Sequence, residues 1–141
     1  YVDLVRTYEK SSEEDKNKAG LFAGKAHLLL GDTTTAKKQF EQVVKETKSI
    51  IGAEAMYNLA EIQFLKKDYK TSQKTCFDLI NNFPNYDYWF AKTFILLADN
   101  YTQLKDKVQA IATLKSVIDN YEGKDEILDI AKDKLNKLDN N

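Results

Sequence analysis

The sequence predicts an all-α protein assembled from repeated pairs of antiparallel helices. Apolar residues recur with helical spacing, and a set of small residues recurs at intervals of 36 and 38 along the chain. The 141 residues include only five glycines and one proline, which leaves little room for long loops and many turns. A helix pair cannot bury its apolar side alone, so we expect the copies to stack into a single solenoid domain over 1–141.

The best-formed helix pair spans residues 53–85 and sets the pattern for the others. An apolar helical pattern runs over 56–65, and the polar turn 66–68 ends it. A second pattern runs over 69–83, and Pro84, the only proline in the chain, ends that one. These signals predict two amphipathic helices joined by a tight turn.

The residues that recur are small ones, placed where the two helices of a pair should cross. Close helix contact requires little side chain at the crossing point. The first-helix position is held by Gly24, Ala60 and Ala98, the second-helix position by Ala36, Ser72 and Ala110, and the position four residues later by Phe40, Cys76 and Leu114. The turn also recurs, with an aspartate that starts the second helix, as Gly31-Asp32, Lys67-Asp68 and Lys105-Asp106.

In chain order, we expect a partial repeat, three full repeats and a capping helix. The segment Tyr1–Glu9 aligns with Leu114–Glu122, so we interpret residues 1–10 as the end of a preceding repeat and the chain as a piece of a longer array. An N-terminal capping helix is the alternative. The full repeats are expected over 14–48, 50–85 and 87–122, and an amphipathic capping helix over 125–138.

Two boundary signals complete this prediction. Ser11 and Glu14 have the spacing of a helix-starting pair, so we expect a new helix that begins there and reaches about Leu30. Gly123 follows the last repeat, and we expect it to end the helix in a left-handed conformation.

Charge and composition exclude several classes of protein. The 21 basic and 22 acidic residues leave a net charge of −1 with no basic stripe, which argues against a nucleic-acid binder. No apolar run approaches the roughly 18 residues that a membrane helix needs, so we expect no membrane insertion by this segment. The single cysteine rules out an internal disulfide or a cysteine-built metal site.

The sequence offers no convincing catalytic group, and we expect neither an enzyme nor a bound cofactor or metal. The only histidine, His27, lies in a first helix, where it is a packing residue in our interpretation rather than a general base or metal ligand. Cys76 occupies a predicted core position. A Cys–His nucleophilic pair requires the two side chains to meet, and these lie in different repeats.

The pattern resembles the tetratricopeptide repeat (TPR) family, in Gly24…Gly31…Ala36…Phe40 and in Leu59-Ala60…Ser72…Pro84. The sequence departs from the family at Gly20, where a large apolar residue is usual, and at Lys48 and Glu122, which replace the closing proline. The resemblance implies a right-handed α-solenoid and a non-enzymatic scaffold for protein–protein interaction.

Two stretches resemble a bacterial subgroup of these repeats. The endings 79–84 and 117–121 look like the subtype common in bacterial envelope assembly proteins. The run 88–99 is similar to large multi-repeat proteins of Bacteroidetes-type bacteria. The resemblance therefore implies a location in the cell envelope, in the periplasm or at the outer membrane.

In this family the first helices line a concave groove, which is the expected binding site for a protein or peptide partner. Helical spacing places ten residues on that face: Leu21, Lys25, Leu28, Tyr57, Asn58, Glu61, Phe64, Lys92, Ile95 and Asp99. The face is apolar in the middle and carries both signs of charge. The alternative is a structural spacer, or a segment that self-associates into a homo-oligomer, with no ligand of its own.

A cluster of aromatic residues is the second candidate surface. Five aromatics fall within eight residues, at Phe83, Tyr86, Tyr88, Trp89 and Phe90. Of these, Tyr86, Tyr88 and Trp89 form the candidate edge for a partner, because Tyr and Trp are favoured anchors of interfaces. In the alternative interpretation, the aromatics fill the joint between two repeats.

Overall fold

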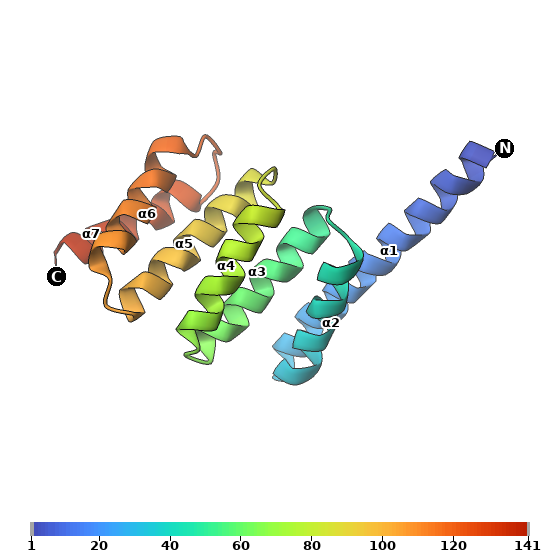
Figure 1. Ribbon diagram of the computed structural model, residues 1–141, viewed down its shortest axis with the longest axis horizontal. Coiled ribbons are helices and arrows are strands. Elements are labelled where there is room, and N and C mark those ends of the chain that lie inside the picture. The colour runs from blue at the N-terminus through green and yellow to red at the C-terminus, as the bar shows by residue number, and fades with distance from the viewer. Residues whose placement is uncertain (1, 141) are drawn as a thin grey trace. The chain divides into compact units, whose positions relative to one another are not determined.

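The computed structural model describes residues 2–140, apart from the side chains of Val2 and Tyr8, and every regular element in that part is an α-helix (Figure 1). Tyr1 and Asn141, the two ends of the predicted domain, lie outside the described residues. The helices are α1 (Val2–Leu29), α2 (Thr33–Glu46), α3 (Ile50–Leu65), α4 (Tyr69–Asn82), α5 (Asp87–Gln103), α6 (Lys107–Asn120) and α7 (Ile127–Asp139). The all-α prediction is confirmed.

The chain divides into two compact units, residues 1–59 and 60–141, with the boundary inside α3. The sequence predicted a single domain over 1–141, and this stays a prediction. In a repeat protein each helix pair contacts mainly its neighbours, so compact units form from contacts that are local in the sequence. The first unit holds α1, α2 and the start of α3, and the second holds the end of α3 and all later helices.

The three predicted turns share one geometry. Gly31, Lys67 and Lys105 follow their first helices in the left-handed conformation, with φ of 81°, 64° and 67°. In each turn the next amide donates to a carbonyl five residues back, as from Asp32 to His27 at 2.8 Å, and the left-handed residue donates three residues back. This is the Schellman arrangement, which satisfies the last carbonyls of the first helix.

The predicted aspartates start the second helices. The Oδ1 atoms of Asp32, Asp68 and Asp106 accept hydrogen bonds from backbone amides three residues on, at 3.1, 3.3 and 3.2 Å. Each bond satisfies one of the free amides at the start of a helix. In Asp32, the hydrogen bonds with Thr35 lower the pKa of the carboxyl group.

Two glycines of α1, one turn apart, let α2 approach closely. A Cβ atom on Gly24 would lie 2.5 Å from a ring carbon of Phe40, and one on Gly20 would lie 2.9 Å from a methyl carbon of Val43. The large Phe40 ring therefore requires glycine opposite it. In the third pair the same two positions are Ala98 and Leu114, which share a core cluster. Alanine is larger than the Gly24 of the first pair, and leucine is smaller than its Phe40.

The boundary predicted near Ser11 is wrong. Helix α1 runs without interruption from Val2 to Leu29, so residues 2–10 continue the first helix of repeat 1 instead of ending a separate repeat. The reason lies in the residues between 10 and 18, which are mainly Lys, Glu, Asp and Ser with no glycine or proline to break the helix. Glu14 has another role, because its carboxylate accepts a hydrogen bond from Ser49 Oγ at 2.8 Å.

Gly123 also differs from the prediction. Among the described residues, Gly31 is the glycine with a positive φ, so Gly123 does not end α6 in a left-handed conformation. Its function is to leave space, since a Cβ atom there would collide with the ring and hydroxyl of Tyr121. Tyr121 itself ends α6 in an extended conformation.

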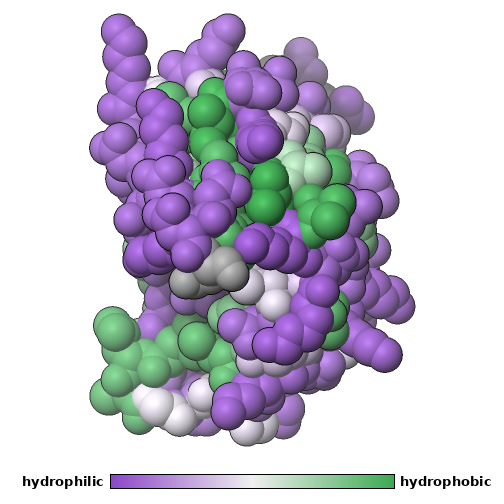
Figure 2. Space-filling model, turned by 90° about the vertical axis from the view of Figure 1, so that its left-hand side faces the viewer, coloured by the Kyte–Doolittle hydropathy of each residue, from purple (hydrophilic) through white to green (hydrophobic). Residues whose placement is uncertain are grey.

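Helix α7 covers the end of the second unit. Ile127 and Ala131 are fully buried in a cluster with Ala98, Leu114 and residues near them, and Ile130, Leu135 and Leu138 pack against that cluster. Seen from the end that carries α7, hydrophilic side chains cover most of the surface, with one hydrophobic area in the upper half of the view and another at its lower left (Figure 2). The helix has the one-sided apolar character that a capping helix requires.

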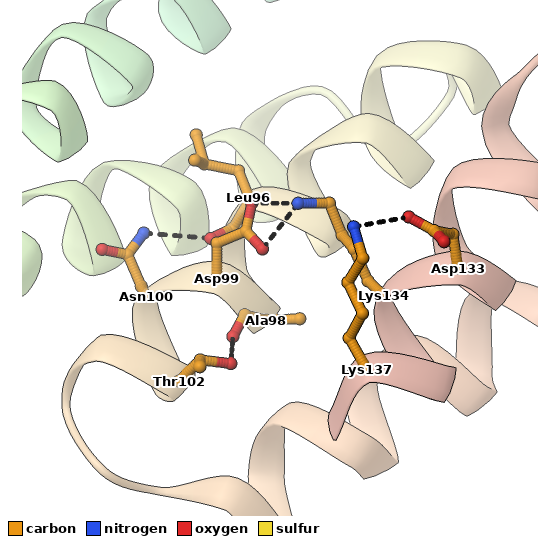
Figure 3. A network of polar contacts seen from close by, with 8 residues as sticks. All are labelled: Leu96, Ala98, Asp99, Asn100, Thr102, Asp133, Lys134 and Lys137. Carbon is orange, nitrogen blue, oxygen red and sulfur yellow. Dashed lines mark hydrogen bonds and ion pairs between the residues drawn. The ribbon is translucent and has the colours of Figure 1, made fainter. Parts of the chain in front are cut away.

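A buried polar network distinguishes the packing of α5 against α4. Asn100 is fully buried, and its Nδ2 donates to Ser72 Oγ at 2.9 Å and to the Leu96 carbonyl at 3.2 Å (Figure 3 shows the second bond). Ser72 Oγ in turn donates to the Ala60 carbonyl at 2.8 Å. The corresponding position of the second repeat holds Ile62. No sequence pattern indicated this network.

Candidate functional site

In the first unit, three of the predicted groove residues and Glu54 form a small mixed patch on α1 and α3. Lys25 Nζ forms an ion pair with Glu54 Oε1 at 2.9 Å, and the Lys25 side chain is 43% exposed. Asn58 Nδ2 donates to the Glu54 carbonyl at 2.9 Å, which fixes the amide one turn from that pair. Leu28 is half-buried. We call Lys25, Leu28, Glu54 and Asn58 the first-unit patch.

The second unit carries a patch of its own. Glu61 and Phe64 lie on the last turn and a half of α3, both partly exposed, and the Phe64 ring makes an edge contact with Tyr69 at 5.3 Å between centroids. On α5, the Lys92 ammonium lies over the rings of Tyr88 and Trp89, at 5.6 and 5.3 Å from their centroids. We call Glu61, Phe64, Lys92 and Asp99, the predicted groove residues of the second unit that stay partly exposed, the second-unit patch.

Three of the ten predicted groove residues are core residues in the structure. Leu21, Tyr57 and Ile95 are 4%, 8% and 6% exposed, so their side chains fill the interior. Helical spacing gave the correct helices but placed these side chains too far toward the surface. Successive residues on a helix are about 100° apart, so a shift in the assumed direction of the groove moves a residue from the surface into the core.

Asp99 is held by the capping helix. Its two carboxylate oxygens accept hydrogen bonds from Lys134 Nζ of α7, at 2.9 and 3.0 Å (Figure 3). Burial raises the pKa of Asp99, and the charge of Lys134 acts in the opposite direction. Asp99 therefore joins α5 to α7.

The partners Glu54 and Lys134 were not predicted. Glu54 lies four residues before Asn58, one turn away on the same helix, so the helical spacing that selected Asn58 contained a signal for it. Lys134 belongs to a different helix, and its pairing with Asp99 depends on how α7 packs. No pattern in the sequence specifies that contact.

The residues of the aromatic cluster mostly pack against one another or form hydrogen bonds within the chain. Phe83 is buried and lies 6.4 Å from the Tyr86 ring, and Tyr88 contacts Trp89 edge to face at 5.0 Å. Tyr88 also donates from its hydroxyl to Glu126 Oε1 at 2.6 Å, and this bond lowers the pKa of Glu126. All three candidate residues, Tyr86, Tyr88 and Trp89, are partly buried.

The two residues with reactive side chains differ in burial, since Cys76 is fully buried and His27 is partly exposed. Burial raises the pKa of Cys76 to about 12, so the thiol stays protonated and a poor nucleophile at neutral pH. His27 lies in the last turn of α1, with Nδ1 3.6 Å from Asp32 Oδ2 across the turn. Among the described residues, no group of three or more His, Cys, Asp or Glu side chains is arranged to hold a metal ion.

Comparison with known proteins gives the family of the repeats. The family model described as "Tetratricopeptide repeat" matches residues 23–46, 54–86 and 93–123, together more than half of the chain. Among solved structures, the N-terminal domain of stress-induced protein-1 (STI-1) from C. elegans is similar, with a TM-score of 0.71 and 14% identity over 90% of this chain and 97% of that one. At that identity the likeness shows the fold, an α-solenoid of helix pairs. No curated protein matches the chain. In the part of the chain that the structure describes, no helix is long and apolar enough to cross a membrane.

Proposed function

This chain belongs to the tetratricopeptide repeat family, and from that premise we propose that it is a non-enzymatic scaffold that binds a segment of a protein partner on the inner faces of its first helices. Repeats of this family serve protein–protein interaction, so a scaffold role follows from membership. Binding on the inner faces is the finer proposal. What supports it is the composition of the two patches on those helices.

Each patch combines apolar surface with charges that are already placed. In the first-unit patch, Glu54 holds the Lys25 ammonium at 2.9 Å beside the half-buried Leu28. In the second-unit patch, Phe64 offers an aromatic face and Glu61 a carboxylate, one turn apart. An interface core needs apolar anchors and a rim of oriented polar groups, and these residues supply both. The pairing of Lys25 and Asp99 with protein groups argues for a peptide or helix instead of a single strongly charged ligand.

The test is a pull-down from the source organism with the wild-type chain and the variant Glu61→Lys/Phe64→Ser. Both residues are partly exposed, whereas Tyr57 is buried, so a change there would test folding. The matched control is Glu41→Lys/Phe77→Ser, which makes the same changes on the second helices α2 and α4 at exposed positions. Loss of a partner only in the first variant is the expected result. Recovery of the same partners by the wild type and both variants would refute partner binding at Glu61 and Phe64.

Self-association is the second candidate function, and one observation favours it. Several large apolar side chains at the first helix are exposed, with Phe22, Leu29 and Leu30 at 65%, 90% and 81%. Apolar surface of this kind often marks an interface. Light scattering on the wild type and on Phe22→Ser/Leu29→Ser/Leu30→Ser tests this role. A wild-type molar mass equal to that of the triple variant, at the monomer value, would rule out self-association.

We further propose a location in the bacterial cell envelope. The proposal rests on the resemblance of residues 79–84 and 117–121 to repeats of envelope assembly proteins. Fractionation of the source organism with an antibody to the chain tests it. Recovery with the cytoplasmic fraction would refute it.

A further inference from the structure

A small apolar hollow lies in the second unit where α5 begins and α6 ends. Its volume is about 220 Å³, and its walls are the side chains of Pro84, Phe90, Phe94, Val117 and Tyr121. Sites for drug-sized ligands usually measure about 300–1,000 Å³, so this hollow is too small for a cofactor. It has room for one large side chain of a partner.

The aromatic walls are fixed in place. The rings of Phe90 and Phe94 lie 4.9 Å apart at an angle of 42°. Tyr121 donates from its hydroxyl to Asp125 Oδ2 at 2.5 Å, and its ring lies in the space left by Gly123. Burial and the hydrogen bond with Asp125 raise the pKa of Tyr121 to about 12, so the phenol is neutral under ordinary conditions. Rings held in this way need little reordering when an aromatic side chain enters.

The rim of the hollow is acidic. Asp87 borders the hollow, and an adjoining depression shares Asp87, Asn120 and Tyr121 with it and extends to Glu122. Both carboxylates are exposed. No lysine or arginine is among the described residues that line the hollow or the depression. The rim is therefore complementary to a positively charged segment.

We propose that this hollow binds an aromatic side chain of a peptide in which lysine or arginine flanks that residue. The ring enters between Phe90, Phe94 and Tyr121, while the flanking cations lie near Asp87 and Glu122. The site uses the edge where α5 begins and α6 ends, so it is separate from the inner faces in the proposed function. It gives the scaffold a second recognition surface with its own chemistry.

The experiment is a titration of the full chain, labelled with ¹⁵N, with the peptide Ac-Gly-Lys-Phe-Lys-Gly-NH₂. We expect saturable shifts of the amides of Ser116, Asn120 and Tyr121, which border the hollow. Replacing both lysines of the peptide by glutamate, or its phenylalanine by serine, should remove most of the binding. The protein variant Asp87→Asn/Glu122→Gln should raise Kd roughly 3- to 10-fold, the effect of losing two exposed charge pairs.

A filling variant and a matched control make the test specific. Ser116 is exposed and borders the hollow, so Ser116→Phe should occupy it and abolish the shifts. Ala112→Phe adds the same ring one turn earlier on α6, at an exposed position outside the hollow, and should leave Kd unchanged. If Ser116→Phe fails to fold, judged by circular dichroism, the charge variant still decides. Equal binding of the lysine and glutamate peptides, or persistence of the shifts in Ser116→Phe, would overturn the proposal. The inner-face variant Glu61→Lys/Phe64→Ser should bind this peptide normally, so the two proposals fail independently.

Discussion

The two terminal helices differ in how far their apolar side chains are buried. Helix α7 buries Ile127 and Ala131 completely and holds Asp99 through Lys134. Helix α1 buries one face against α2 but leaves Phe22 and Leu29 exposed. Both helices have amphipathic sequences, so the difference in burial comes from the helices that pack against them. An apolar face is a cap only when a neighbouring core receives it, and otherwise it is a surface.

The largest expected effect comes from shortening a buried side chain of α7. Ile127→Ala should lower the free energy of unfolding by about 2–5 kcal/mol, because it leaves a cavity in a packed cluster. The paired change Phe22→Ala, on the open side of α1, should change it by no more than about 0.5 kcal/mol. Urea unfolding measures both. Similar losses for the two variants would show that the open side of α1 is packed as tightly as α7.

The next effect tests how closely the first helix pair is packed. Gly24→Ala should cost about 1–3 kcal/mol, because the new methyl group meets the Phe40 ring. Adding Phe40→Leu copies the Ala98 and Leu114 combination of the third pair and should recover part of the loss. A double-mutant cycle by thermal melting gives the coupling. Additive changes would mean that the ring moves aside without cost.

At neutral pH, the Lys134 charge should add about 1 kcal/mol to the free energy of unfolding through its ion pair with Asp99, compared with a chain that lacks this charge. This value is near the upper end for a partly exposed pair. The folded state raises the pKa of Asp99, so the folded chain binds this proton more tightly than the unfolded chain. The contribution of Asp99 to stability is therefore full below about pH 4 and declines as the pH rises through its folded pKa.

Removing the Lys134 charge should make the loss of stability between pH 3 and pH 7 larger. Lys134→Met takes away the charge that opposes the rise in the Asp99 pKa, so the variant should lose stability at pH 7 and lose less at pH 3. Chemical denaturation at the two values measures the difference. Lys137→Met is the control, since its pair with Asp133 lies within α7 and is well exposed. A loss for Lys134→Met that is the same at both values would refute the electrostatic account.

The smallest expected effect concerns the turns, in which the first unit uses glycine and the second unit uses lysine. Lys67→Gly and Lys105→Gly should each stabilise by roughly 0.5 kcal/mol, because a left-handed backbone strains a residue with a Cβ and this gain exceeds the entropy that glycine loses on folding. Gly31→Lys should destabilise by a similar amount. Lys66→Gly, which follows α3 with an ordinary φ, is the control and should not stabilise. Thermal melts of the four variants test the set.

The sequence was sufficient for the features that depend on local chemistry. The three turns and their aspartate caps follow from residues within a few positions of each other, and so does the end of α4 before Pro84. The exact exposure of Leu21, Tyr57 and Ile95 depends on how far neighbouring helices overlap, which local patterns do not encode. The pairing of Asp99 with Lys134, and the hollow between Phe94 and Tyr121, arise from helices that meet only in the folded chain. Gly123 shows the limit clearly, because one residue type serves either a left-handed turn or a tight contact.

The shared turn geometry has a consequence for the exchange of amide hydrogens with solvent. The amides of Asp32, Asp68 and Asp106 donate to carbonyls inside the preceding helices, although these residues lie at exposed turns. They should therefore exchange slowly, at a rate set by the opening of the helix before them. Because the carboxylate of each aspartate also accepts a hydrogen bond from the following helix, we expect the two helices of a pair to open together. The amide exchange rate should therefore be similar within each helix pair and differ between pairs, with the fastest exchange in the segments between pairs.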